Sequence, residues 1–124
     1  MTIILIAATA AAMVTFAVHT FAGGVFVARP LLADTSLPPL SKWLNYYCWH
    51  ITSVLIVFIA AGFLWLALHP GESALLFGLS ALSAALCGLS IAVGLKAAIN
   101  PLRFPSTSLF ALIAALGWCA FLLR

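Results

Sequence analysis

Two histidines, His19 and His50, hold most of the chemistry that this sequence offers inside its hydrophobic segments. An imidazole can bind a haem iron or a transition metal, or it can hydrogen-bond a ligand or a neighbouring helix. Ionisable side chains inside a membrane are costly, so their presence there favours a functional role. The pair is therefore the centre of the candidate site.

Polar side chains accompany each histidine at helical spacing. Residues three or four positions apart share one face of a helix. Around His19 this spacing selects Thr15 and leaves bare backbone at Gly23. The residues predicted to converge on one pocket are His19, His50, Thr15, Tyr46, Tyr47 and Ser53, with Arg29 at its mouth.

This pocket has two interpretations. In the first, the histidines hydrogen-bond each other, Thr15 or Tyr46, and only fix how the helices align. In the second, the pocket binds a ligand, either a b-type haem between two neutral imidazoles or a quinone or lipid headgroup near Arg29. A metal site is not expected, because no third histidine, cysteine or carboxylate lies at ligand spacing.

No catalytic motif accompanies the histidines. The sequence has no Ser-x-x-Lys, His-Glu-x-x-His or glycine-rich phosphate loop. Asp34 and Glu72 both fall in predicted loops, which argues against a small proton-coupled transporter that needs a carboxylate inside the membrane. Enzymatic activity is left open, with the balance against it, and no catalytic residue is assigned.

The composition places the chain in a lipid bilayer. Hydrophobic residues make up 66% of its 124 residues and charged residues 6%, and the mean hydropathy is +1.28. A soluble domain carries about 25% charged residues. The net charge of +3 does not indicate nucleic-acid binding, because most of the basic residues lie beside apolar segments.

Four hydrophobic stretches predict four transmembrane helices in one domain, residues 1–124. Pro30 disfavours the helical conformation at Arg29, so the first helix should end there. The tight turn at residues 69–72 joins antiparallel neighbours. The predicted fold class is an all-α, antiparallel, integral membrane four-helix bundle, with helices at about 3–28, 39–68, 73–99 and 105–123.

Charge sets the expected orientation. The first and third loops hold four basic residues, Arg29, Lys42, Lys96 and Arg103. The opposite side has only Arg124, so the positive-inside rule predicts that both termini face outward. His19 and His50 should then lie at similar depth, about 10–15 Å from the cytoplasmic edge.

The third helix carries small residues at four-residue spacing, which let helix backbones approach closely in lipid. They are Ser80, Ala84, Gly88 and Ala92. This face is predicted to make the tightest helix–helix contact, either within the chain or between copies. It favours a non-enzymatic protein that associates with itself or with a larger membrane complex. The alternative is a redox or ligand-binding membrane protein that uses His19 and His50.

Residues 15–55 resemble small four-helix proteins of the bacterial inner membrane. Those proteins carry a His-x-x-x-Gly pattern late in the first helix, then Arg-Pro-Leu-Leu, and a Trp-His pair early in the second. The matching positions here are His19 to Gly23, residues 29–32, and Trp49-His50. The resemblance to these inner-membrane proteins implies the architecture and a shared polar motif, but no reaction. With the charge bias, it predicts a location in the bacterial inner membrane with both termini in the periplasm.

Overall fold

The structure, a computed structural model, describes all 124 residues and consists of four long helical segments joined by short loops. The first segment contains α1 (Thr2–Ala17), the π-helical stretches η1 (Val18–Ala22) and η2 (Gly24–Ala28), and α2 (Arg29–Ala33). The others are α3 (Pro39–Leu68), α4 (Ser73–Lys96) and α5 (Pro105–Leu122), the last preceded by the 3₁₀ turn η3 (Pro101–Arg103). All four segments are long and apolar enough to cross a membrane. The predicted all-α four-helix bundle is confirmed.

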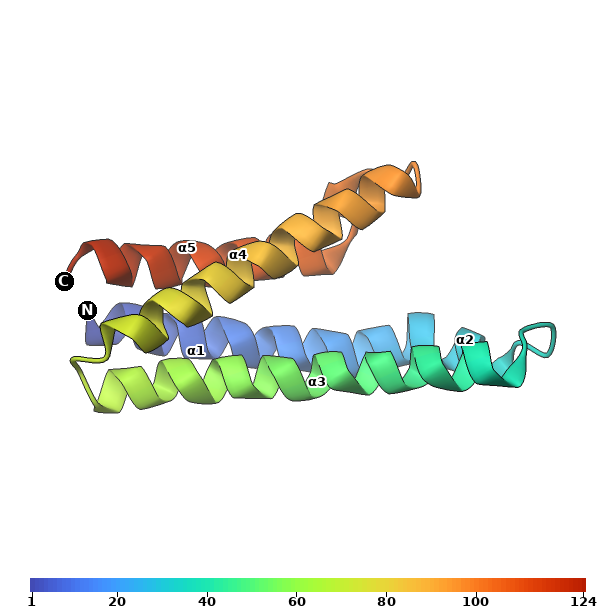
Figure 1. Ribbon diagram of the computed structural model, residues 1–124, viewed down its shortest axis with the longest axis horizontal. Coiled ribbons are helices and arrows are strands. Elements are labelled where there is room, and N and C mark those ends of the chain that lie inside the picture. The colour runs from blue at the N-terminus through green and yellow to red at the C-terminus, as the bar shows by residue number, and fades with distance from the viewer.

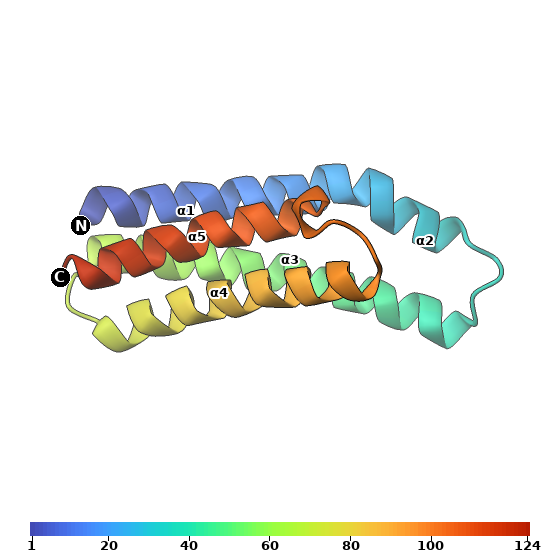
Figure 2. The same ribbon diagram turned by 90° about the horizontal axis from the view of Figure 1, so that it is seen from above.

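The segments form two antiparallel hairpins of unequal length. Both termini and the turn at residues 69–72 lie at one end, the terminal end (Figure 1). The loops at residues 34–38 and 97–104 lie at the opposite end, the loop end. The hairpin of the first segment and α3 reaches further toward the loop end than the hairpin of α4 and α5 (Figure 2).

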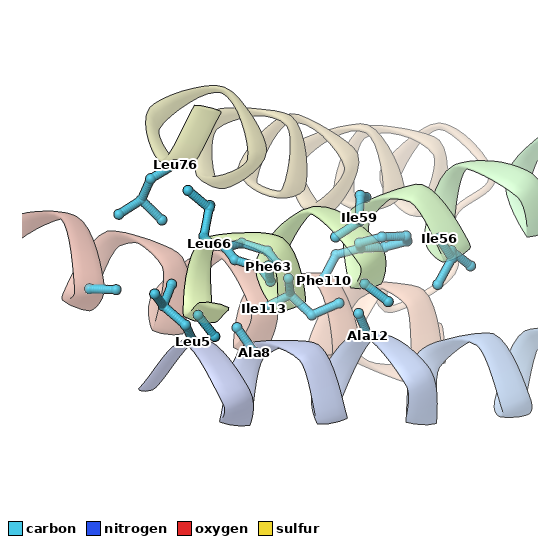
Figure 3. Packing of buried hydrophobic residues seen from close by; sticks show 13 residues of the cluster. Leu5, Ala8, Ala12, Ile56, Ile59, Phe63, Leu66, Leu76, Phe110 and Ile113 are labelled. Carbon is cyan, nitrogen blue, oxygen red and sulfur yellow. The ribbon is translucent and has the colours of Figure 1, made fainter. Parts of the chain in front are cut away.

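The first segment packs against two of the other three long helices. Its α1 packs against both α3 and α5, whereas α4 packs mainly against α5. Although a tight turn joins α3 and α4, the two helices separate toward the loop end (Figure 1). Figure 3 shows the buried core, in which Leu5 and Ala8 of α1 lie near Phe63 of α3 and Ile113 of α5.

One glycine brings three helices together. Gly117 of α5 is buried, and a Cβ added there would meet the hydroxyl oxygen of Ser80 in α4 and the ring of Phe63 in α3. Phe63 and Ser80 are each 0% exposed. The absence of a side chain at Gly117 therefore sets how closely α3 and α4 approach α5.

The first segment continues past the proline that was expected to end it. The helix runs through Pro30 to Ala33, so the predicted end near Arg29 is wrong. In an α-helix the proline ring clashes with the carbonyl four residues earlier. Here the π-helical turn before Pro30 is wider, and the N–H of Arg29 donates to the carbonyl of Gly24, five residues back.

The segment ends instead at Asp34, whose backbone turns extended with ψ of 122°. The Asp34 carboxylate accepts hydrogen bonds from the Ser36 hydroxyl at 2.6 Å and the Ser36 N–H at 2.7 Å. These two bonds lower the pKa of Asp34 below its ordinary value. Lys42 also donates to the carbonyl of Leu32 at 3.2 Å, which joins α2 to the start of α3.

The other helix boundaries lie close to the predicted ones. α3 spans the predicted residues 39–68, and α5 ends at Leu122 rather than at residue 123. α4 stops at Lys96 rather than at residue 99. It stops early because Ala98 adopts a positive φ of 55°, which an α-helix does not allow.

The small-residue face of α4 makes little contact inside the chain. Of its four members only Ser80 is buried, while Ala84, Gly88 and Ala92 are exposed. A Cβ added at Gly88 would meet no atom within 4 Å. The prediction that this face makes the tightest helix–helix contact is therefore wrong within the chain.

Hydroxyl groups hold α4 against α5 instead. The Ser90 hydroxyl oxygen lies 2.7 Å from the hydroxyl oxygens of both Ser106 and Thr107. The Cys87 thiol donates to the Thr107 carbonyl at 3.4 Å. Because lipid offers no competing partners, such bonds favour one alignment of neighbouring helices.

Candidate functional site

His19 contacts Trp49 in two ways. The two rings stack, with centroids 3.9 Å apart and an interplanar angle of 20°. In addition, Nε2 of His19 lies 3.2 Å from the backbone carbonyl oxygen of Trp49. A carbonyl oxygen only accepts, so Nε2 is the donor. The pair joins η1 to α3 at a point where both helices are only partly buried.

Gly23 makes room for this contact. It lies four residues after His19 and therefore on the same face of the helix. A Cβ added at Gly23 would collide with the six-membered ring of Trp49, so the indole rests directly on the backbone. The next residue, Gly24, has open space at the same position. The two ends of the His-x-x-x-Gly pattern thus form the surface on which Trp49 packs.

A cavity of about 410 Å³ opens beside this pair, between the first segment, α3 and the start of α5. Small-molecule sites commonly enclose about 300–1,000 Å³. Most of the wall is apolar. The lining residues are Thr15, Val18, His19, Ala22, Gly23, Phe26, Val27, Trp49, Thr52, Ile56, Phe104, Pro105, Ser106, Leu109 and Phe110. We call this space the His19 cleft.

The π-helical stretches form one wall of the His19 cleft. His19 and Ala22 belong to η1, and Phe26 belongs to η2. The hydroxyl oxygen of Thr20, also in η1, is the one buried side-chain polar atom of the chain without a hydrogen-bond partner. Single π-helical turns occur frequently at functional sites, because they change where the following side chains point.

His50 lies outside the His19 cleft. Its side chain is exposed, and its ring meets that of Tyr46 edge-on, with centroids 4.6 Å apart. His50 and Tyr47 line a separate and more open groove of about 430 Å³ on α3 alone. Because consecutive residues of a helix point about 100° apart, turning Trp49 toward His19 turns His50 away.

The structure therefore separates the residues that the sequence groups in one pocket. Thr15 and His19 line the His19 cleft, whereas His50, Tyr46 and Tyr47 do not. Two other predicted members also lie outside it. The Ser53 hydroxyl donates to the Trp49 carbonyl at 3.4 Å, and Arg29 is exposed nearer the loop end. A haem held by both histidines would require their rings to turn toward one space.

No family model matches this chain, and no curated protein or solved structure matches it. The resemblance to small inner-membrane proteins stays a prediction. Fold alone does not define function, so the function is argued from the site.

Sequence reasoning missed three of the five side chains with polar groups that line the cleft, those of Trp49, Thr52 and Ser106. Trp49 was assigned to a motif but not to the pocket, although a glycine four residues after His19 is a signal that something large packs there. Thr52 follows Trp49 by three positions and so shares its face. Ser106 carries no such signal, because α5 reaches the cleft only through the tertiary packing.

The wall of the His19 cleft is suited to holding an apolar molecule in a defined orientation. The polar groups available are one imidazole, one indole and three hydroxyls, surrounded by aliphatic and aromatic side chains. The chain has no group of three His, Cys, Asp or Glu side chains placed to hold a metal ion. A mostly apolar cavity with a few polar groups is the usual form of a small-molecule site.

Proposed function

We propose that this chain is a multi-pass membrane protein that binds an amphipathic, lipid-soluble small molecule in the His19 cleft. Molecules of the quinone type, with a polar ring and an apolar tail, fit this description. The observation that carries the proposal is a cavity of about 410 Å³ that has His19 in an otherwise mostly apolar wall.

The position of the cleft supports this proposal. Phe104 and Pro105, at the start of α5, line the same cavity as Trp49 of α3. The basic residues Lys96 and Arg103 flank the loop just before α5. Basic residues commonly mark the headgroup level of a membrane. The cleft then lies just below the headgroups, where an amphipathic molecule concentrates.

Binding can be tested with a pair of matched variants in lipid nanodiscs. Ala22 lines the cleft, and Ala10 is an exposed alanine of the same segment that does not line it. Saturable binding of a short-tailed quinone should weaken at least about tenfold in Ala22→Phe, because the ring fills the cavity. Ala10→Phe should bind like the wild type. Absence of saturable binding to the wild type, or equal binding by both variants, would overturn the proposal.

A second candidate function is self-association through α4. The exposed small residues Ala84, Gly88 and Ala92 favour it, because they leave a helix surface on which a second backbone can pack closely. The partner would be another copy or a subunit of a larger membrane complex. Such a protein needs no ligand in the His19 cleft.

Self-association can be measured by crosslinking or native mass spectrometry in a mild detergent. Gly88→Leu should shift the protein to monomer, because the leucine holds the two backbones apart. Gly78→Leu is the control, since Gly78 is an exposed glycine on α4 with the same open surroundings. A wild-type monomer without a co-purifying subunit, or equal effects of both variants, would rule out this candidate.

We also propose that the membrane is the bacterial inner membrane, with the loop end in the cytoplasm and both termini in the periplasm. The four basic residues in or beside the two loops of the loop end support this orientation. They are Arg29, Lys42, Lys96 and Arg103. Alkaline phosphatase fused to the carboxyl terminus should be active and green fluorescent protein dark. Fluorescent protein fusions that are bright and phosphatase fusions that are inactive would indicate the opposite orientation.

A further inference from the structure

The hydrogen bond between His19 and Trp49 restricts what the cleft can recognise. Nε2 of His19 donates to the Trp49 carbonyl oxygen at 3.2 Å, so Nε2 carries the hydrogen. In a neutral imidazole only one nitrogen carries a hydrogen, and the other has a lone pair. Nδ1 of His19 is therefore a hydrogen-bond acceptor.

This acceptor is free. No hydrogen bond within the chain involves Nδ1 of His19, whose only side-chain bond is the one to Trp49. Nδ1 is also not buried, because the Thr20 hydroxyl is the only buried side-chain polar atom without a partner. Since His19 lines the cleft, its lone pair is open to a molecule that brings a donor.

The neighbouring hydroxyls in the wall do not supply that donor. The hydroxyl of Thr15 donates to the backbone carbonyl four residues earlier at 2.8 Å, and that of Thr52 does the same at 3.2 Å. The Ser106 hydroxyl is shared with Ser90 at 2.7 Å, on the α5 side of the cleft. The indole N–H of Trp49 has no partner in the chain and is not buried. The indole and imidazole rings are stacked with centroids 3.9 Å apart, so this donor and the Nδ1 acceptor belong to one stacked pair that lines the cleft.

A hydroxyl matches both kinds of group, because it donates through its hydrogen and accepts through its oxygen. A carbonyl or an ether oxygen only accepts and leaves Nδ1 without a partner. The wall also contains aromatic rings from all three helical segments. They are Phe26, Trp49, Phe104 and Phe110. Such rings pack favourably against the ring of an aromatic ligand.

We infer that the His19 cleft selects a lipid-soluble phenol or hydroquinone, whose hydroxyl donates to Nδ1 of His19, over the corresponding quinone or ether. This inference rests on the proposed function, since it names the class of ligand that the same cleft takes. It assigns binding and selectivity to His19, and no chemical step.

The test compares two ligands that differ only in the donor. They are para-decylphenol and its methyl ether, para-decylanisole, each measured against protein in nanodiscs and against empty nanodiscs. At about pH 8 an ordinary imidazole is neutral. The wild type should bind the phenol about tenfold more tightly, which is the effect of one hydrogen bond in a dry site. In His19→Phe the two affinities should come within about threefold of each other.

Each result decides between the two proposals. Equal wild-type affinities for the two ligands would overturn the donor inference and leave ligand binding intact. If none of the three compounds, the phenol, the anisole and the quinone, bound saturably, the proposal of ligand binding itself would be overturned. If His19→Phe fails to fold, ¹⁵N NMR of wild-type His19 replaces it. The Nδ1 resonance should be that of an unprotonated nitrogen and should shift on addition of the phenol but not of the anisole, and any other pattern overturns the inference.

Discussion

The imidazole of His19 is stacked on the indole of Trp49, 3.9 Å between centroids, and is bonded to the carbonyl of the same residue. The side chain of His19, in the first segment, therefore contacts both the ring and the backbone of Trp49 in α3. The Ser53 hydroxyl donates to the same carbonyl, which places two side-chain donors on one oxygen. This contact joins the first segment to α3, the two arms of the long hairpin, beside the His19 cleft.

Replacing His19 by Phe separates the two parts of the contact. The phenyl ring can keep the stack on Trp49, but the hydrogen bond to the carbonyl is lost. The free energy of unfolding should fall by about 0.5–1.5 kcal/mol, measured by denaturant titration in bicelles. Since Ser53 still donates to that carbonyl in His19→Phe, the double variant with Ser53→Ala should lose more stability than the sum of the two single losses. Two additive variants would mean that the donors act independently.

Adjacent glycines in the first segment should respond in opposite ways to alanine. Gly23→Ala pushes a methyl group into the Trp49 ring and should cost about 1–3 kcal/mol of stability. Gly24→Ala meets nothing and should be neutral or should stabilise the helix by about 0.5–1 kcal/mol. The indole NMR resonance of Trp49 should move only in Gly23→Ala. Similar unfolding curves for the two variants would contradict the close contact of the ring with Gly23.

The same comparison applies to the centre of the bundle. Gly117→Ala should destabilise the fold by about 1–3 kcal/mol, because its methyl group meets Ser80 and Phe63. Gly88→Ala should leave the stability of the monomer unchanged or slightly raised, since its surroundings are open. Thermal unfolding in detergent distinguishes the two. A greater loss in Gly88→Ala would place the close helix contact on the outer face of α4.

The hydroxyl cluster between α4 and α5 should contribute measurably to stability. Ser90→Ala removes both 2.7 Å contacts, and Thr107→Val removes one of them. Membrane hydrogen bonds average about 0.6 kcal/mol each, so Ser90→Ala should cost about 1 kcal/mol. The double variant should cost less than the two singles added together. Ser108→Ala, on an exposed residue, is the control and should have no effect.

Acid should loosen the turn that ends the first segment. The Ser36 hydroxyl and N–H lower the pKa of Asp34, so the folded turn favours the carboxylate. The resulting stabilisation is complete above the ordinary Asp pKa of about 3.9 and is lost as the pH falls through the lower pKa of the folded state. The amide NMR resonance of Ser36 should therefore shift only below about pH 4. In Asp34→Asn this titration should be absent.

Helix positions were predictable because long apolar stretches and turn residues define them directly. The bounds of α3 follow from Pro38 and Pro39 at one end and the Pro70-Gly71 turn at the other. The course of the first segment was not predictable in this way. Whether Pro30 ends a helix or is accommodated depends on a local change to π-helical bonding, which no single residue type announces.

The composition of the site was less predictable than the spans. In lipid, apolar residues occupy outer and inner faces alike, so hydrophobic periodicity does not report how a helix is rotated. On α3, for example, Phe58 is 70% exposed and Phe63 is 0% exposed. Spacing rules therefore grouped His50 with His19, whereas the rotation of α3 turns Trp49 inward. The prediction that the small residues of α4 make the tightest contact was wrong within the chain for the same reason.

The unequal hairpins give this protein two hydrophobic thicknesses. α3, with 30 residues, is about 45 Å long, and α5, with 18 residues, is about 27 Å long. A hydrocarbon core of about 30 Å suits α5, whereas α3 must tilt or thicken the bilayer around it. If α3 does not tilt, the leaflet at the loop end must change height across the width of one small protein. The His19 cleft lies where the short hairpin ends, between the first segment, α3 and the start of α5. Under the proposed function, a ligand would therefore enter it sideways from the acyl chains without passing through water.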